Sequence, residues 1–503
     1  MAHAGDPMAS CFAASLFFEG NNCCVARNEA KSEEFASKSI PAIRDLSDRF
    51  QNKFAQYHLG VFLLRGIGVR KDESEAIRLL TLSASQEYAL AQCTLGCCYN
   101  DGVGVERNGT KAFEMFLMAA QQQRADGQYY VGCVCEADGH AEKAARYYQF
   151  AARQGYSPAQ FRLGCCLEAG MGVAQDELEA FLHYSRAAEQ KHPLAQYALG
   201  RLYLSGRGVM RSEAHAVRCF QLAADNGQPD AQWELGGCFM NGVGTVKSEG
   251  MAVYYRKLAA DQGHQAAQYA MGDYYLNGVG MVANEAMAAR YYKLSADQGN
   301  MHAQFNIATS YQDGRGVTAD SSEAARYFQL AALQGHAMSQ FCLGCCYAKG
   351  SGVEQSDVEA VRCYRLAVDR PQGYFKAQYA LGLCLEKGRG VERNDAEAVQ
   401  YYQLAAEQGY HQAQYSLGSC CEKGKGISKS EEMAVLYYKL AADQGNVQAM
   451  HCLALCFAHG RGVAVADLSQ AMEYYERASA KGSTARIDML ERRRAKAQAA
   501  SHC

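Results

Sequence analysis

The chain has 503 residues, of which 49% are hydrophobic and 20% are charged. Its 50 basic and 53 acidic residues leave a net charge of −3, so no overall field favours nucleic acid or an anionic lipid surface. We therefore expect no nucleic-acid partner. We also expect no direct membrane insertion, because no apolar run approaches the roughly eighteen residues that a spanning helix needs.

Residues 1 to about 20 show little pattern, and we predict an N-terminal extension with one or two helices over residues 1–50. Residues 28–40 favour a helix that ends at Pro41, and residues 42–54 favour a further helical stretch. The apolar segment 11–18 has no Lys or Arg before it, which makes it a poor signal peptide. We expect it to be a degenerate helix that packs on the first repeat.

Residues 51–484 contain one unit twelve times, at a spacing of 36 residues almost throughout. The third spacing is 32, because that copy keeps only Asp138-Gly139 between its two halves, and the ninth is 38, with Arg370 and Pro371 as the extra pair. A small residue opens each copy. These residues are Ala55, Ala91, Gly127, Ala159, Ala195, Ala231, Ala267, Ala303, Ser339, Ala377, Ala413 and Ala449. A fixed period of this length is typical of a solenoid, whose units bury their apolar faces only by stacking on neighbours.

Each copy reads as two helices joined by a turn. In the seventh copy, apolar or small residues recur at helical spacing within 267–275 and again within 288–296, on either side of Gly278-Val279-Gly280. Asp, Asn or Ser stands where the second helix should begin in eleven copies, which predicts a column of N-caps. The predicted caps are Asp72, Asn108, Asp176, Ser212, Ser248, Asn284, Asp320, Ser356, Asn394, Ser430 and Asp467.

A glycine recurs inside the first helix of ten copies. It occupies positions 60, 96, 132, 164, 200, 236, 272, 344, 382 and 418. A glycine in a helix interior costs roughly 1 kcal/mol relative to alanine, so its repetition needs a compensating contact. We expect close approach of the paired helix, whose facing column is alanine.

The motif A-Q-Y-x-L-G-x-x-Y-x-x-G-x-G-V, followed by x-x-A-x-x-Y-Y-x-L-A-A-x-Q-G, resembles the Sel-1-like repeat, a relative of the tetratricopeptide repeat. The resemblance covers residues from about 50 to about 485. It implies an all-α fold, an α-solenoid of about twelve two-helix repeats wound as a right-handed superhelix. It also implies a non-enzymatic scaffold or adaptor that binds a partner protein or peptide on the concave face.

Proteins that this chain resembles include adaptors of membrane-bound protein-degradation complexes, activators of cell-wall synthases and bacterial host-interaction factors. One alternative is therefore a regulatory subunit of a protein-degradation or cell-wall-synthase assembly, and another is a secreted or luminal cysteine-rich Sel-1-like factor. An enzyme would need a catalytic domain, and the sequence shows no HExxH, nucleophile elbow or phosphate-binding loop. We expect no catalytic residues, no cofactor and no metal site, and the sequence leaves the oligomeric state open.

The 22 cysteines raise the question of a disulfide framework. Seven share one column of the first helix with Phe62, Val134, Leu202 and Tyr274, which indicates a buried apolar position. Equivalent positions in packed helices lie about 8–10 Å apart, beyond the roughly 7 Å limit for a bridge. Cys342 and Cys345 have CxxC spacing but no partner pair, which favours core packing over zinc. Free thiols favour the cytoplasm, with the ER lumen or secretion as the alternative.

A glutamine follows the opening residue in eleven copies, at positions 56, 92, 128, 160, 196, 232, 268, 304, 340, 378 and 414. Such a column might hydrogen-bond a ligand backbone. Its uniformity favours a structural bond to the neighbouring repeat, because a partner is rarely periodic.

The candidate binding surface is the stripe of the first helices where copies differ most, three, six and ten residues after the opening residue. Its members are Arg162, Ala198, Arg201, Glu234, Asp273, Asn277, Asn306, Asp313, Lys387 and Lys423. The alternative is a merely solvated face.

Residues 485–503 are polar and helical by composition, and we predict a C-terminal capping helix and tail that shields the last apolar face. The basic run Arg492–Arg494 within it favours a solvated helix face over a binding patch.

Overall fold

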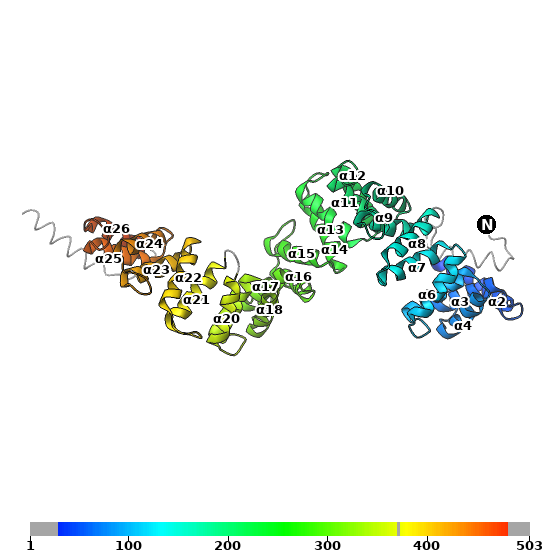
Figure 1. The fold of residues 1–503 in the computed structure, drawn as a ribbon, viewed down its shortest axis with the longest axis horizontal. Coiled ribbons are helices and arrows are strands. Elements are labelled where there is room, and N and C mark those ends of the chain that lie inside the picture. Colours follow the sequence, from blue (N-terminus) through cyan, green and yellow to red (C-terminus); the bar gives the residue numbers. More distant parts are fainter. Residues whose placement is uncertain (1–28, 370–372, 481–503) are drawn as a thin grey trace, which may run out of the picture. The chain divides into compact units, whose positions relative to one another are not determined.

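The computed structural model describes residues 29–369 and 373–480, and these contain 25 helices and no strand (Figure 1). The chain divides after Gln262 into two compact units. The first unit contains α2 (Glu29–Asp48), α3 (Lys53–Arg65), α4 (Glu73–Ser85), α5 (Ala89–Asp101), α6 (Gly109–Gln121), α7 (Ala125–Ala137), α8 (Ala141–Arg153), α9 (Ser157–Ala169), α10 (Glu177–Glu189), α11 (Pro193–Ser205), α12 (Glu213–Asp225), α13 (Pro229–Asn241) and α14 (Glu249–Asp261).

The second unit contains α15 (Gln265–Asn277), α16 (Glu285–Asp297), α17 (Met301–Asp313), α18 (Ser321–Leu333), α19 (Ala337–Lys349), α20 (Asp357–Val368), α21 (Phe375–Lys387), α22 (Asp395–Glu407), α23 (His411–Lys423), α24 (Glu431–Asp443), α25 (Val447–His459) and α26 (Leu468–Ser479). None of the helices in 29–369 and 373–480 combines the length and the apolar content that crossing a bilayer requires.

The helices pair as hairpins, from α3 with α4 to α25 with α26. Within each unit, the second helix of a hairpin also packs against the first helix of the next one. The prediction of an all-α solenoid of about twelve repeats is thus confirmed. The first 28 residues of the predicted N-terminal extension 1–50, with the apolar stretch 11–18, lie outside the described residues. The predicted C-terminal segment 485–503, with the basic run Arg492–Arg494, and the Arg370-Pro371 pair also lie outside them.

The N-terminal extension differs from the prediction in one respect, because α2 is continuous through Pro41. A proline inside a helix removes one backbone hydrogen bond and usually kinks or ends the helix. Here Ala36 and Ile43 are fully buried in the cluster that α2 forms with α3, one on each side of the proline. Packing therefore holds a helix that local propensity alone would break.

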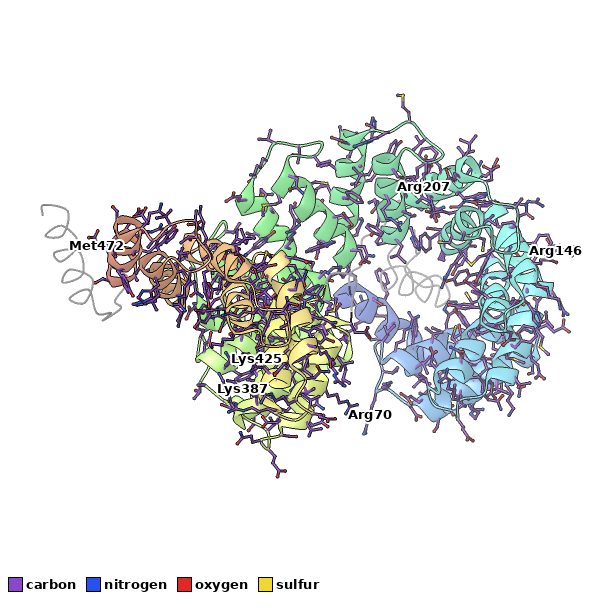
Figure 2. The ribbon with its side chains drawn as sticks, turned by 60° about the vertical axis from the view of Figure 1, so that its left-hand side comes forward. Arg70, Arg146, Arg207, Lys387, Lys425 and Met472 are labelled. Atoms are coloured by element: carbon purple, nitrogen blue, oxygen red, sulfur yellow. The ribbon has the colours of Figure 1, made fainter. Side chains whose placement is uncertain are left out.

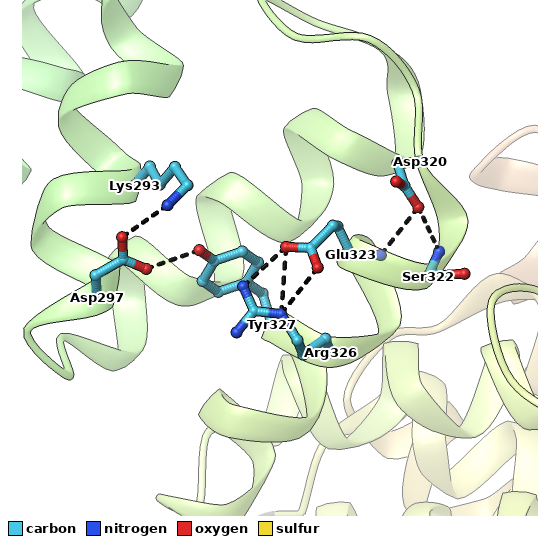
Figure 3. Close-up of polar contacts among 7 residues, drawn as sticks. All are labelled: Lys293, Asp297, Asp320, Ser322, Glu323, Arg326 and Tyr327. Carbon is cyan, nitrogen blue, oxygen red and sulfur yellow. Dashed lines mark hydrogen bonds and ion pairs between the residues drawn. The ribbon is translucent and has the colours of Figure 1, made fainter.

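The boundaries of the second helices confirm the predicted caps. In each of the eleven copies, the predicted residue is the N-cap and its side chain accepts a backbone N–H. Asp320, for example, accepts from the amides of Ser322 at 2.9 Å and Glu323 at 3.1 Å (Figure 3). The third copy has His140 at this position and no side-chain cap.

Neighbouring second helices are also linked by polar side chains. Tyr327 on α18 donates its hydroxyl hydrogen to Asp297 at the end of α16, at 2.8 Å, and Lys293 lies 2.8 Å from the other carboxylate oxygen (Figure 3). Burial disfavours the charged form of Asp297, but the bonds from Lys293 and Tyr327 outweigh it and lower the pKa of this carboxyl.

The recurrent mid-helix glycine does face the paired helix at close range. A Cβ built on Gly200 would lie only 2.4 Å from the ring of Phe220 on α12, and one on Gly164 would lie 2.6 Å from the ring of Tyr184 on α10. Contacts below about 3 Å do not occur between real carbon atoms, so any larger residue would separate the two helices. The aromatic ring of the second helix thus fills the space that the glycine leaves.

The glutamine column is structural, as predicted. Gln92 donates to the carbonyl of Ala84 in the preceding hairpin, at 3.3 Å, and accepts from Gln122 at the end of its own hairpin, at 2.9 Å. The bond to the preceding hairpin recurs for the glutamines at 160, 196, 232, 304, 340 and 414. In the ninth copy Gln340 Oε1 has no partner among the described residues.

We expect opposite effects from alanine at two helix glycines of the first unit. Gly200→Ala should lower the free energy of unfolding by about 1–3 kcal/mol, because the new methyl group collides with Phe220. Gly237→Ala should raise it by about 1 kcal/mol, because the nearest atom to a Cβ there is 3.6 Å away and alanine favours the helix. Urea denaturation of the full chain followed by circular dichroism measures both. Equal gains for the two variants would contradict the close approach.

Candidate interaction surface

The predicted stripe separates into exposed and half-buried residues. Glu234, Asp273, Asn306 and Ala198 are half-buried. The others are exposed, namely Arg162, Arg201, Asn277, Asp313, Lys387 and Lys423. Six of the ten stripe residues are therefore open to a partner, and Lys387 and Lys423 stand in the last turns of α21 and α23, where cations favour the helix dipole.

Several exposed members already contact neighbours in the fold. The Arg162 guanidinium lies 3.7 Å from the Glu136 carboxylate, and Arg201 lies 6.0 Å from the centre of the Tyr197 ring. Asp313 pairs with Arg315 in the turn that follows α17. These contacts orient the side chains without burying them.

Asp273 has a structural partner instead. Its carboxylate accepts a hydrogen bond from the hydroxyl of Tyr292 on the paired helix, at 2.7 Å. Burial raises the pKa of this carboxyl, although the bonds from Tyr292 and Tyr269 oppose the change. Asp273 is thus tied to its own hairpin, which makes it a poorer contact residue than the exposed stripe members.

We did not single out from the sequence the glutamates that stand nine residues after the opening residue in some copies. Glu168, Glu386 and Glu422 each accept a hydrogen bond from a tyrosine of their own hairpin's second helix. Each also pairs with a cation in the turn of the next hairpin. The three pairs are Arg207 with Glu168 at 2.6 Å, Lys425 with Glu386 at 2.8 Å, and Arg461 with Glu422 at 3.0 Å. We call these residues the carboxylate ladder (Figure 2 labels Arg207 and Lys425).

A signal for the ladder was present in the sequence. In these three cases the glutamate and its cation are 39 residues apart, one repeat plus the distance from helix to turn. The correspondence is incomplete: Leu204 and Met240 are matched with Val243 and Val279, whereas Leu276 is matched with Arg315. A search for acid and base 39 residues apart at these two positions would still have identified the three pairs.

The ladder carboxylate Glu386 is held ionised by its partners. Burial disfavours its charged form, but hydrogen bonds from Lys425 and Tyr402 outweigh burial and lower its pKa. The same contact with Glu386 raises the pKa of Lys425. Both groups are about one quarter exposed, so the pair forms part of the surface and not of the core.

The first unit also has a hollow of about 400 Å³ on the face formed by α3, α5 and α7. Arg124 and Asp126, just before and at the start of α7, lie on its wall with a 2.8 Å ion pair. Burial opposes ionisation of Asp126, but the hydrogen bonds from Arg124 outweigh it and lower the pKa of the carboxyl. Neither residue was singled out from the sequence, because both precede the periodic positions of the third copy.

The cysteines contribute no chemical site among the described residues. Eighteen of them are free in 29–369 and 373–480, and no cluster of His, Cys, Asp or Glu in these ranges could hold a metal ion. Burial raises the pKa of Cys98 and Cys166 to about 11, which makes these thiols unreactive at neutral pH. Cys342 and Cys345 are half-buried helix residues, as the core-packing interpretation expects.

Glu386→Gln tests the ladder through its pH dependence. A carboxyl whose pKa is lowered on folding stabilises the protein above its unfolded pKa of about 4.3 and loses this contribution as the pH falls through the folded value. At pH 7 we expect the free energy of unfolding of the variant to be lower by about 1 kcal/mol, a small value because solvent screens the pair. At pH 3 the two proteins should unfold at the same urea concentration.

The control for this experiment is Glu392→Gln, which changes an exposed carboxylate after the same turn. It should leave the urea midpoint unchanged at both pH values. An equal loss for Glu386→Gln at pH 7 and pH 3 would mean that packing, and not ionisation, is responsible.

Comparisons with known proteins agree with this geometry. The Sel1 repeat profile matches twelve consecutive segments, at 53–88, 89–123, 125–156, 157–192, 193–228, 229–264, 265–300, 302–336, 337–371, 375–410, 411–446 and 447–483. A comparison with curated proteins found no match.

Two solved structures are similar to this chain. One is c5321, a protective antigen of uropathogenic Escherichia coli with an SLR fold, at 26% identity over 90% of both chains and a TM-score of 0.65. The other is a Sel1 repeat protein from Oxalobacter formigenes, at 30% identity over 50% of this chain and 98% of that one, with a TM-score of 0.44. With twelve matched repeats across most of its length, the chain belongs to the Sel1 repeat family.

Proposed function

We propose that the chain is a non-enzymatic scaffold that binds a protein or peptide partner on the face formed by the first helices of its hairpins. The observation that carries the proposal is the contrast between constant and variable positions. The constant positions, the glycines, glutamines and caps, hold the frame together. Six of the ten variable positions on the first helices are exposed charged or polar residues, which is the arrangement that partner recognition uses.

Two features of the first-helix face support this assignment. The hollow between α3, α5 and α7 offers a concave apolar and polar surface. In the second unit, Lys349, Lys387 and Lys423 occupy equivalent positions at the ends of successive first helices, and all three are exposed. A row of cations at one rim favours a partner with an acidic segment.

A role without catalysis fits the family, since the Sel1 repeat fold is typical of scaffolds. The fold does not choose between an independent adaptor and a regulatory subunit of a larger complex. We also propose a cytoplasmic location. Its support is that the described helices contain buried, free thiols.

Charge reversal on the exposed part of the stripe tests the binding face. Arg201→Glu in the first unit and Lys387→Glu with Lys423→Glu in the second should each weaken binding of a partner identified by affinity purification, by about ten-fold. Isothermal titration calorimetry with the purified partner measures the change. Asp273 is left intact, because its reversal would break the bond to Tyr292.

The matched control is Arg362→Glu on α20, which lies on a second helix and is 73% exposed. It should leave partner affinity unchanged. If Arg362→Glu weakens binding and the stripe variants do not, the partner binds the opposite face.

The compartment is tested by counting thiols. After denaturation without reductant, we expect about 22 reactive thiols per chain by reaction with a chromogenic disulfide, one for each cysteine of the sequence. In the native protein the buried cysteines should react slowly. Thiols that appear only after reduction would indicate disulfides and a luminal or secreted protein.

A further inference from the structure

The turn between the two helices of a hairpin packs on the hairpin before it. A Cβ built on Gly172 would lie 2.2 Å from the carbonyl oxygen of Ala141, the first residue of α8. One built on Gly208 would lie 2.1 Å from the carbonyl oxygen of Glu177, the first residue of α10. Each turn therefore seats its second glycine against the start of the preceding second helix.

The residue after this glycine completes the contact. Val173 packs on a core cluster that its own hairpin shares with the preceding one, and Val209 does the same one hairpin further along. In the turn that contains Val209, the residue between the two glycines is Arg207, which pairs with Glu168 of the preceding hairpin. In this turn the segment Gly206–Val209 fills the gap between consecutive hairpins, and we call it the plug.

The third hairpin lacks this plug. Three residues, Asp138–His140, join α7 to α8, whereas seven residues, Gly206–Ser212, join α11 to α12. Judged by the spacing of the repeat, a turn of full length in the third hairpin would have covered Gly109, the first residue of α6. A Cβ built on Gly109 meets no atom within 4 Å, so that position is open.

A cavity of about 670 Å³ lies at this place. Its lining includes Gly109, Thr110 and Phe113 of α6, with Val134 and Ala137 at the end of α7. We call this cavity the notch. Its volume falls in the range of about 300–1,000 Å³ that is usual for ligand sites.

The notch resembles the surroundings of the other turns, except that Asn100 occupies the position equivalent to Glu168, which receives Arg207. Phe113, Phe116 and Val134 supply an apolar floor, and Asp101 and Asp138 add carboxylates at the lining. No Lys or Arg is among the residues that line it. An occupant with one apolar side chain and one neighbouring cation would satisfy both features.

We propose that the notch is a docking site for a partner segment of the type glycine, basic residue, glycine, apolar residue, which takes the place of the turn that the third hairpin lacks. The inference rests on the proposed function and names one contact that the partner makes. The five turns that have Arg207, Arg315, Arg389, Lys425 or Arg461 between their glycines show that such a segment fits this position when the chain itself supplies it. In the third hairpin a second molecule supplies it.

The test uses a fluorescent peptide that copies residues 204–212, the turn with Arg207, and the full chain. We expect saturable binding by fluorescence anisotropy. A peptide with Gly208→Asp and Val209→Ser should bind about ten-fold more weakly, because the side chain at position 208 prevents the close approach to a backbone carbonyl that Gly208 makes. Absence of saturable binding up to about 1 mM of the first peptide would overturn the proposal.

A loop graft provides the second arm. Replacing Asp138–His140 by the turn Gly206–Ser212 should fill the notch from within, so that the peptide binds the graft about ten-fold more weakly than the natural chain. The matched control is the same graft with Gly208→Asp and Val209→Ser in the donated turn, which has equal length but cannot seat and should keep peptide binding. Equal peptide binding by both grafts would overturn the proposal.

The same graft separates this inference from the scaffold function. If the graft blocks the peptide but a purified partner still binds with unchanged affinity, the scaffold function stands and the partner does not use the notch, which overturns the proposal. If the natural chain self-associates by analytical ultracentrifugation and the peptide or the graft abolishes this, the occupant is a second copy of the chain, which also overturns it.

Discussion

The structure depends on the contact between a glycine in the first helix and an aromatic ring of the second helix, which is present in eight of the twelve hairpins. At Gly164 this ring is Tyr184, and its position has a consequence beyond the helix pair. The Tyr184 hydroxyl donates to Glu168 at 2.8 Å, and Glu168 receives Arg207 from the next hairpin. One aromatic side chain thereby connects the packing within a hairpin, a surface carboxylate and the neighbouring repeat. Replacement of the glycine would disturb all three.

The regular frame leaves few positions free to differ, and this defines where function can reside. Helix caps, turn glycines and the glutamine column satisfy backbone and side-chain hydrogen bonds that would otherwise be unpaired. What remains is the exposed part of both helices of each hairpin and, among the described hairpins, the third one, whose turn is shortened. Such a scaffold gains binding specificity from exposed side chains that the fold does not need, and from the one hairpin whose turn is shortened.

The sequence predicted most of the frame, because caps, turns and the repeat period are local signals. It predicted the structural use of glutamine because a uniform column indicates an internal partner. The sequence was less informative for Asp273. A helical projection predicts exposure, whereas the bond from Tyr292 to Asp273 depends on how two helices pack. Pro41 misled the prediction for the opposite reason, because burial of Ala36 and Ile43 overrode a local preference. The shortened third turn was visible in the sequence, but the cavity beside it requires knowing that turns seat on the preceding hairpin.

We propose that a partner contacts the first-helix face, and not the outer face of the second helices. Hydroxyl-radical footprinting of the full chain with its affinity-purified partner distinguishes these two faces. We expect protection of side chains around Tyr197 on α11 and Tyr130 on α7. Tyr254 and Leu333, which are 54% and 79% exposed on second helices, should keep their reactivity. Protection confined to Tyr254 and Leu333 would mean that the partner binds the second helices instead.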